Sequence, residues 1–216
     1  MSRKKKFKRI LLCALLISLP LLSMNNNITK TDKSYSDNNE EMCKNDSLYE
    51  LDSIVLYRMT QDFKKDSIKN ELINETDRYI SSITSKAHNS LPKFLVENAL
   101  TYNIDIMFML AQTQIETTFG TAGAGRESSR RSLFGVAIRK YTDYEKAIID
   151  YCELLKKSYL TKGRTEHHLM KKYTTTGGSR YAGNPNYEYE LSNTYKQISR
   201  NTKLKKLQNE YKLIIE

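Results

Sequence analysis

Apolar residues recur at three- and four-residue spacing along most of the chain, and this periodicity restricts the fold more than any other feature. It predicts helices over residues 48–59 and 68–83 and more helices downstream. Residues 133–138 are the exception, because their short apolar run indicates a strand or an extended segment. No strand-helix alternation, internal repeat or array of membrane spans is visible. We therefore expect a mainly α fold with one core, for which 216 residues suffice.

Local signals predict where the later helices begin and end. The helix that carries Glu116 should begin around Asp105 and stop at Gly120, because glycine adopts the left-handed conformation readily. The other signals mark where helices begin. Ser90 with Pro92 predicts the start of a helix that ends near Asn103, and Thr142 or Asp143 predicts the start of a second helix. Thr165 predicts the start of a short helix that ends near Tyr173, and Asn184 with Pro185 predicts the start of the last one.

The N-terminus combines a basic cluster with an apolar run. Lys and Arg dominate residues 3–9, and residues 10–24 are apolar except for two serines and Pro20. This order is typical of a secretory signal peptide, and the run is shorter than the ~20 apolar residues that span a bilayer. Because no clear cleavage site follows, residues 1–24 are predicted to be a signal peptide or an N-terminal anchor. The protein is expected to be exported to the periplasm or cell envelope and to contact the membrane only through residues 10–24.

Composition divides the rest of the chain. Residues 25–46 are mostly Asn, Lys, Ser, Asp and Glu, with too little apolar surface to offset their ordering entropy, and are predicted to be a flexible linker. Residues 47–88 are predicted to form a helical N-terminal extension that packs or acts as a spacer. Cys43 and Cys152 either pair in an oxidising compartment or remain two unpaired thiols.

Charge and motifs disfavour several functions. The formal net charge is +10, but much of it lies in the N-terminal cluster, and no stripe of Lys and Arg interleaved with aromatics predicts nucleic-acid binding. The remaining charge suits an anionic polymer such as a cell wall. His167 and His168 are adjacent, so on a helix they point about 100° apart and cannot share a metal ion. No phosphate-binding loop occurs, and we expect no metal or organic cofactor. The oligomeric state stays open.

Glu116 is the candidate catalytic acid. A glycosidase needs a carboxyl group that keeps its proton near neutral pH, and burial among apolar side chains raises a carboxyl pKa. The helix that carries Glu116 is rich in apolar residues, and the negative end of a helix dipole acts in the same direction. By itself, a Glu near a helix end is more often a solvated surface residue.

Four segments of the chain form a pattern: Leu110–Thr121, Ser132–Val136, Tyr141–Tyr151 and Arg180–Leu191. Together they resemble the glucosaminidase family, glycoside hydrolase family 73. They occur in the order and with the gaps of that family and cover roughly residues 90–200.

The resemblance implies a lysozyme-like helical domain over residues 89–216 and hydrolysis of peptidoglycan glycan strands as an endo-β-N-acetylglucosaminidase. Glu116 matches the general acid, and Tyr181 matches a tyrosine that faces this acid and positions substrate or water. The positions that match substrate-binding ones are Phe134, Ser132, Thr117 and Tyr187, of which Phe134 and Tyr187 also read as core packing.

Two departures from the family leave the mechanism open. Ser132 stands where Asn is frequent, and only residues 137–140 separate two segments between which many members carry a β lobe with a second carboxylate. Little or no β lobe is therefore expected here. Glu127 is the nearest replacement carboxylate, although it also reads as a solvated loop charge. Otherwise Tyr181 activates water, or the N-acetyl group of the substrate acts as internal nucleophile.

Two other functions remain compatible with this sequence. A lytic transglycosylase also uses one Glu but closes an anhydro ring on muramic acid. A catalytically inactive wall-binding protein is favoured by the missing lobe and by Ser132.

Overall fold

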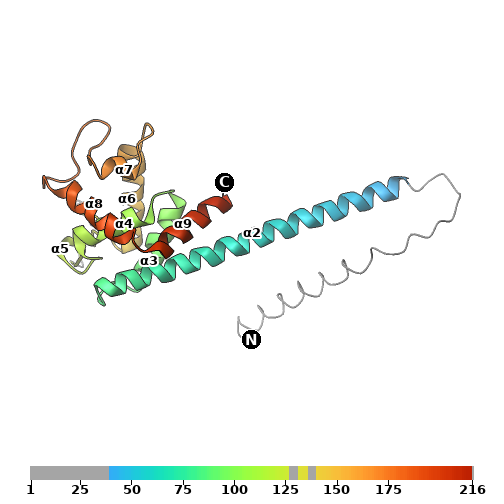
Figure 1. The fold of residues 1–216 in the computed structure, drawn as a ribbon, viewed down its shortest axis with the longest axis horizontal. Coiled ribbons are helices and arrows are strands. Elements are labelled where there is room, and N and C mark those ends of the chain that lie inside the picture. Colours follow the sequence, from blue (N-terminus) through green and yellow to red (C-terminus); the bar gives the residue numbers. More distant parts are fainter. Residues whose placement is uncertain (1–38, 127–130, 136–139, 216) are drawn as a thin grey trace. The chain divides into compact units, whose positions relative to one another are not determined.

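The structure is a computed structural model that describes residues 39–126, 131–135 and 140–215. Within these ranges it contains helices and no strand, apart from one isolated antiparallel bridge between Thr174 and Arg180. The prediction of a mainly α, lysozyme-like domain is thus confirmed. The helices (Figure 1) are α2 (Asn39–Ile83), α3 (Leu91–Thr101), α4 (Ile106–Thr117), α5 (Gly123–Arg126), α6 (Tyr144–Leu154), a π-helical turn (Leu155–Tyr159), α7 (Glu166–Leu169), α8 (Tyr187–Ile198) and α9 (Thr202–Ile215).

The chain divides into two compact units, residues 1–52 and 53–216, and the site lies in the second. Helix α4 runs through the core of this unit, and its residues from Ile106 to Thr113 are buried. Neighbouring helices fix its N-terminal end. The Asp105 side chain caps α4 and accepts a hydrogen bond of 2.7 Å from the Tyr195 hydroxyl of α8, while Oε1 of Gln208 in α9 accepts from the Ile106 amide at 2.9 Å. Helix α4 is therefore a rigid support for the residues at its other end.

Helix α4 ends earlier than the glycine signal predicts. Its last residue is Thr117, and Thr118, Phe119 and Gly120 follow with φ of 47°, 58° and 80°. Left-handed backbone is unfavourable for Thr and Phe. The Phe119 ring is buried and lies edge-on to Tyr79, so its packing stabilises this left-handed turn. The prediction from sequence attributed the end of the helix to Gly120 alone.

Most other predicted helix starts agree with the structure. Ser90 is the N-cap of α3, Thr165 caps α7, and Asp143 caps α6 by accepting from the Lys146 amide at 2.8 Å. The apolar run at 133–138 was predicted to be a strand or an extended segment. The structure has a turn at residues 133 and 134 and no strand over 133–135, and residues 136–138 lie outside the described ranges.

The N-terminal extension is one continuous helix rather than several. Helix α2 begins at Asn39, inside the span predicted to be a linker. In the second unit it packs through buried Ile68, Leu72 and Ile80, and Lys203 of α9 bonds to Glu71 at 2.9 Å. Residues 1–38 lie outside the described ranges, so the signal peptide or anchor stays a prediction. Among the described helices, none is long and apolar enough to cross a membrane.

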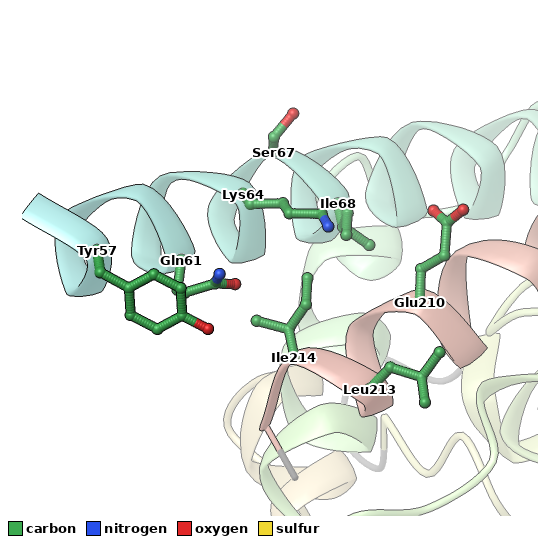
Figure 2. A pocket seen from close by; sticks show the side chains of 8 residues that line it. All are labelled: Tyr57, Gln61, Lys64, Ser67, Ile68, Glu210, Leu213 and Ile214. Atoms are coloured by element: carbon green, nitrogen blue, oxygen red, sulfur yellow. The ribbon is translucent and has the colours of Figure 1, made fainter. Parts of the chain in front are cut away.

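Helices α2 and α9 enclose an open groove of about 580 Å³ on the N-terminal side of the packed part of α2 (Figure 2). Tyr57, Lys64 and Ile68 line it from α2, and Leu213 and Ile214 from α9. Tyr57 and Leu213 are 66% and 73% exposed. Packing between the two helices therefore stops near Ile68.

Cys152 is a free thiol buried in the core, which favours the alternative of unpaired thiols. Burial raises its pKa to about 12, so the thiol is protonated at neutral pH. The side chain of Cys43 is not among those that the structure describes.

Candidate active site

Glu116 lies in the last turn of α4 and is partly buried. Burial raises the pKa of its carboxyl group, and a hydrogen bond from Tyr187 opposes part of that rise. The Tyr187 hydroxyl donates to Oε1 of Glu116 at 2.5 Å. The carboxyl group therefore retains its proton to a higher pH than a solvated glutamate.

The exposed residue Gly135 lies directly against the Glu116 carboxyl group. Its φ is +64°, and a Cβ atom at this position would overlap Oε2 of Glu116. Glycine is thus required here both for the backbone conformation and for the space that the carboxyl group occupies. The Glu116 carboxyl group thus packs against the backbone of an exposed residue.

A cluster of tyrosines surrounds the other side of Glu116. The ring of Tyr181 stacks on Tyr173, with centroids 4.3 Å apart and planes 7° apart, and is tilted against Tyr187 at 5.6 Å. Tyr159 meets Tyr173 edge-on at 5.2 Å. Stacked and edge-on pairs of this kind contribute packing energy beyond the burial of area.

A short hairpin, residues 173–181, and the first turn of α8 hold this cluster of tyrosines together. The Tyr181 amide donates to the Tyr173 carbonyl at 2.9 Å, which brings their two rings to the same face. Glu188 in α8 accepts from the Tyr173 amide at 3.0 Å and pairs with Arg180 at 2.7 Å. Both ends of the hairpin are thereby bound to the helix that carries Tyr187.

The comparison with protein families agrees with this arrangement. The family model of glucosaminidases, described as mannosyl-glycoprotein endo-beta-N-acetylglucosaminidase, matches residues 93–200, which is half of the chain. The protein belongs to the glucosaminidase family. It is therefore a member of a glycoside hydrolase family. A search of curated proteins finds no match for the chain.

The matched part of the glucosaminidase domain contains the whole of the Glu116 site. Helix α4, Gly135, the hairpin and α8 all lie between residues 93 and 200. Helices α2 and α9 lie outside the match, although α9 caps α4 through Gln208. Helix α9 thus supports the matched domain from outside the matched range.

Tyr187, and not Tyr181, makes the hydrogen bond to Glu116. In the glucosaminidase domain it is Tyr187 that bonds to Glu116, whereas the Tyr181 hydroxyl donates to the Phe134 carbonyl. Tyr181 remains close enough that the charge of Glu116 acts on its pKa. The Tyr181 ring also packs against the ring of Tyr187, whose hydroxyl bonds to the acid.

The other predicted substrate-binding residues are buried. The Phe134 ring stacks on Tyr151 with centroids 3.7 Å apart, and it is 1% exposed. The Thr117 hydroxyl donates to the Leu133 carbonyl and accepts from the Gly120 amide, both at 3.0 Å. Ser132 is 2% exposed. These positions shape the backbone beside Glu116, and a direct contact with substrate stays a prediction for each.

Glu127, the predicted second carboxylate, lies outside the described residues. Among the described residues, no group of three or more His, Cys, Asp or Glu side chains is placed to hold a metal ion. The described chemistry of the site is thus one carboxyl group among phenols.

Two residues of the site were not singled out from the sequence. Gly135 follows Phe134 in one of the four family-like segments, but nothing in the sequence shows that its missing side chain makes room for Glu116. Gln112 lies four residues before Glu116 and is fully buried. A polar residue on the apolar face of the same helix was the available signal for it.

Proposed function

We propose that the protein is a peptidoglycan hydrolase that cleaves β-1,4 bonds of the glycan strand as an endo-β-N-acetylglucosaminidase, with Glu116 as the general acid. The observation that carries this proposal is the environment of the Glu116 carboxyl group. It is partly buried, its pKa is raised, one phenol bonds to it, and Gly135 leaves room for it. A carboxyl group that keeps its proton is what departure of a sugar requires.

The tyrosines of the site are poor candidates for the base. Burial raises the pKa of Tyr181 and Tyr187 well above the ordinary value, and the negative charge of Glu116 acts in the same direction. Both hydroxyls therefore stay protonated at neutral pH and donate hydrogen bonds. A group that keeps its own proton does not remove one from water.

We therefore propose that the substrate supplies the nucleophile. Glu116 transfers its proton to the glycosidic oxygen as the bond from C1 to that oxygen breaks, and the carbonyl oxygen of the N-acetyl group bonds to C1. Water then opens the resulting ring, and its proton returns to Glu116. This substrate-assisted route needs one protein carboxylate instead of two.

The products of digestion test the reaction. Purified sacculi are incubated with the protein and the fragments are analysed by mass spectrometry. Reducing N-acetylglucosamine ends support the proposal, while anhydromuramic ends would show a lytic transglycosylase. Glu116→Gln should abolish release of fragments. If the wild type binds sacculi and releases nothing, the protein is a wall-binding protein and not an enzyme.

Two further measurements test the internal nucleophile. Glycan strands whose glucosamine lacks the N-acetyl group should resist cleavage, since they lack the attacking oxygen. Glu127→Gln should leave the rate within about threefold of wild type, because a lost general base costs 10²–10⁴-fold. A large loss in Glu127→Gln, with cleavage of deacetylated strands by the wild type, would instead identify Glu127 as the second carboxylate.

The substrate and the N-terminal sequence together support an exported protein. Peptidoglycan lies outside the cytoplasmic membrane, and residues 1–24 have the order of charges and apolar residues of an export signal. Fractionation of cells with an antibody to the protein tests this location, and N-terminal sequencing of the envelope form distinguishes cleavage from anchoring.

A further inference from the structure

Gln112 lies one turn before Glu116 on α4 and is completely buried. Residues four apart lie on the same face of a helix. Oε1 of Gln112 accepts hydrogen bonds from the hydroxyls of Tyr151 and Tyr173, the second at 3.0 Å. These hydroxyls are themselves 3.2 Å apart. One amide oxygen therefore fixes the positions of two buried phenols.

The first of two chains of contacts leads from Gln112 to Glu116 through the tyrosine cluster. The Tyr173 ring is 5.9 Å from the Tyr187 ring and stacks on Tyr181, which lies between them in sequence and touches both. Tyr187 then donates to Glu116. A displacement of Tyr173 thus moves the Tyr181 ring, which packs against Tyr187 and so orients the hydroxyl that bonds to Glu116.

The second chain of contacts passes through the opposite wall of the site. Tyr151 stacks on Phe134 with planes 6° apart. The next residue is Gly135, which lies against the Glu116 carboxyl group. Both walls around the acid are therefore built on phenols that the Gln112 amide holds.

The amide of Gln112 has an unsatisfied donor. In the described part of the chain, its Nε2 is buried and has no hydrogen-bond partner. A buried donor without a partner destabilises a fold, and an apolar side chain at this position would avoid the cost. The acceptor oxygen is therefore the atom through which this side chain acts on its neighbours.

We propose that Gln112 is a positioning residue for Glu116: by holding Tyr151 and Tyr173 it fixes both the Tyr187 hydroxyl and the Gly135 backbone around the acid. This inference rests on the proposed role of Glu116. It assigns Gln112 no contact with substrate.

The titration of Glu116 reports this positioning. The described titratable groups on which the Glu116 charge acts are Tyr173, Tyr181 and Tyr187, from the hairpin and α8. Of these, Tyr187 lowers the pKa of Glu116 through its hydrogen bond. When Gln112 no longer holds the cluster, Tyr187 spends less time bonded to Glu116, and the pKa of the acid rises.

The test compares Gln112→Met with Gln114→Met in the full 216-residue chain. Methionine has nearly the length of glutamine but accepts no strong hydrogen bond. Gln114 is the matched control, because it lies on the same helix and accepts from the Tyr79 hydroxyl at 2.6 Å, outside the two chains of contacts. The pKa of Glu116 is measured by NMR with ¹³C-labelled glutamate, with its signal assigned from Glu116→Gln.

Gln112→Met should raise the pKa of Glu116 by about half a unit or more, while Gln114→Met leaves it in place. In a Tyr187→Phe background, the Gln112 substitution should add a smaller shift, since only the second chain of contacts, through Phe134 and Gly135, still reaches the acid. Unequal losses of thermal stability without a shift in either variant would show that Gln112 is only structural. If Gln112→Met does not fold, Tyr173→Phe, which keeps the ring but removes one donor, should give a smaller shift in the same direction, and no shift overturns the proposal.

The NMR titration also separates this inference from the proposed function. It needs no turnover, so the pKa of Glu116 can respond to Gln112 even if sacculi are not cleaved. Absence of cleavage with a normal response refutes the enzyme assignment alone. Cleavage whose pH dependence is the same in Gln112→Met and wild type refutes the positioning role alone.

Discussion

Tyr187→Phe is the substitution that most directly tests the account of the active site. It removes the hydroxyl that donates to Oε1 of Glu116 at 2.5 Å and keeps the ring against Tyr181. A hydrogen bond contributes about 1.5–3 kcal/mol to a charged partner and about 0.5–1.5 kcal/mol to a neutral one. The ionised form of Glu116 therefore loses roughly 1 kcal/mol more than the protonated form, which corresponds to just under one pKa unit at about 1.4 kcal/mol per unit.

The expected result is a shift of the alkaline limb of the pH profile. Glu116 must be protonated to act as general acid, so a higher pKa extends activity toward higher pH. Because the carboxyl group is only partly buried, water replaces part of the lost bond, and the shift should be about half to one pH unit. The assay is the clearing of suspended sacculi across pH 4.5–9, with initial rates converted to kcat/KM.

Tyr195→Phe is the matched control for this experiment. Its hydroxyl also donates to a carboxylate, that of Asp105 at 2.7 Å, but at the opposite end of α4. It should lower the thermal stability without moving the alkaline limb. A limb that stays in place in Tyr187→Phe, or moves toward lower pH, would show that Tyr187 does not stabilise the ionised acid.

The remaining predictions concern space, charge and backbone support around Glu116. Gly135→Ala should lower kcat at least tenfold, because the added Cβ displaces the Glu116 carboxyl group. The control is Gly163→Ala, at a similar φ of +74° with nothing within 4 Å of the added Cβ: it should carry the same backbone strain and show normal activity in the same assay. Glu116→Gln should raise Tm by about 1–3 °C at pH 7 and not at pH 4. Because the pKa of Glu116 is raised in the folded state, the wild-type protein loses stability as pH rises through the interval between the unfolded and folded pKa values, and glutamine does not ionise. Calorimetry at the two pH values measures the difference. Thr117→Val should cost about 1–3 kcal/mol in urea unfolding, since it leaves the Gly120 amide and the Leu133 carbonyl without their buried partner, while Thr101→Val at an exposed site should cost under about 0.5 kcal/mol.

Much of the fold follows from sequence because helix boundaries depend on local order, whereas Glu116 as the acid rests on the family-like segments and stays a proposal. The cap signals at Ser90, Asp143 and Thr165 act within one helical turn, and the structure places all three where they were expected. The end of α4 was misplaced because its left-handed turn at Thr118 and Phe119 depends on burial of the Phe119 ring, which is a tertiary contact.

The roles of the two tyrosines show where sequence reasoning stops. Tyr181 and Tyr187 are six residues apart, and either hydroxyl could have faced Glu116. The choice depends on the hairpin, which turns the Tyr181 hydroxyl toward the Phe134 carbonyl, and on Glu188, which fixes the hairpin to α8. Two contacts decide this arrangement, and each joins residues far apart in the sequence: 47 positions for Tyr181 and Phe134, and 71 for Tyr187 and Glu116. No local pattern contains that information.

The use of tyrosine around the acid has a physical reason of its own. A general acid passes through both protonation states in each turnover, so its surroundings must accept an ionised and a neutral carboxyl without titrating themselves. A second carboxylate would compete for the proton, and a lysine or arginine would lower the pKa of Glu116. Buried phenols do not compete for the proton, because burial and the nearby Glu116 charge raise the pKa of Tyr173, Tyr181 and Tyr187 and keep each a permanent donor. They carry no positive charge, and Tyr187 lowers the pKa of Glu116 only through its hydrogen bond. In such a cluster the proton affinity of Glu116 depends on how closely one hydroxyl approaches it, and the rigidity of the rings that hold this hydroxyl becomes part of the chemistry.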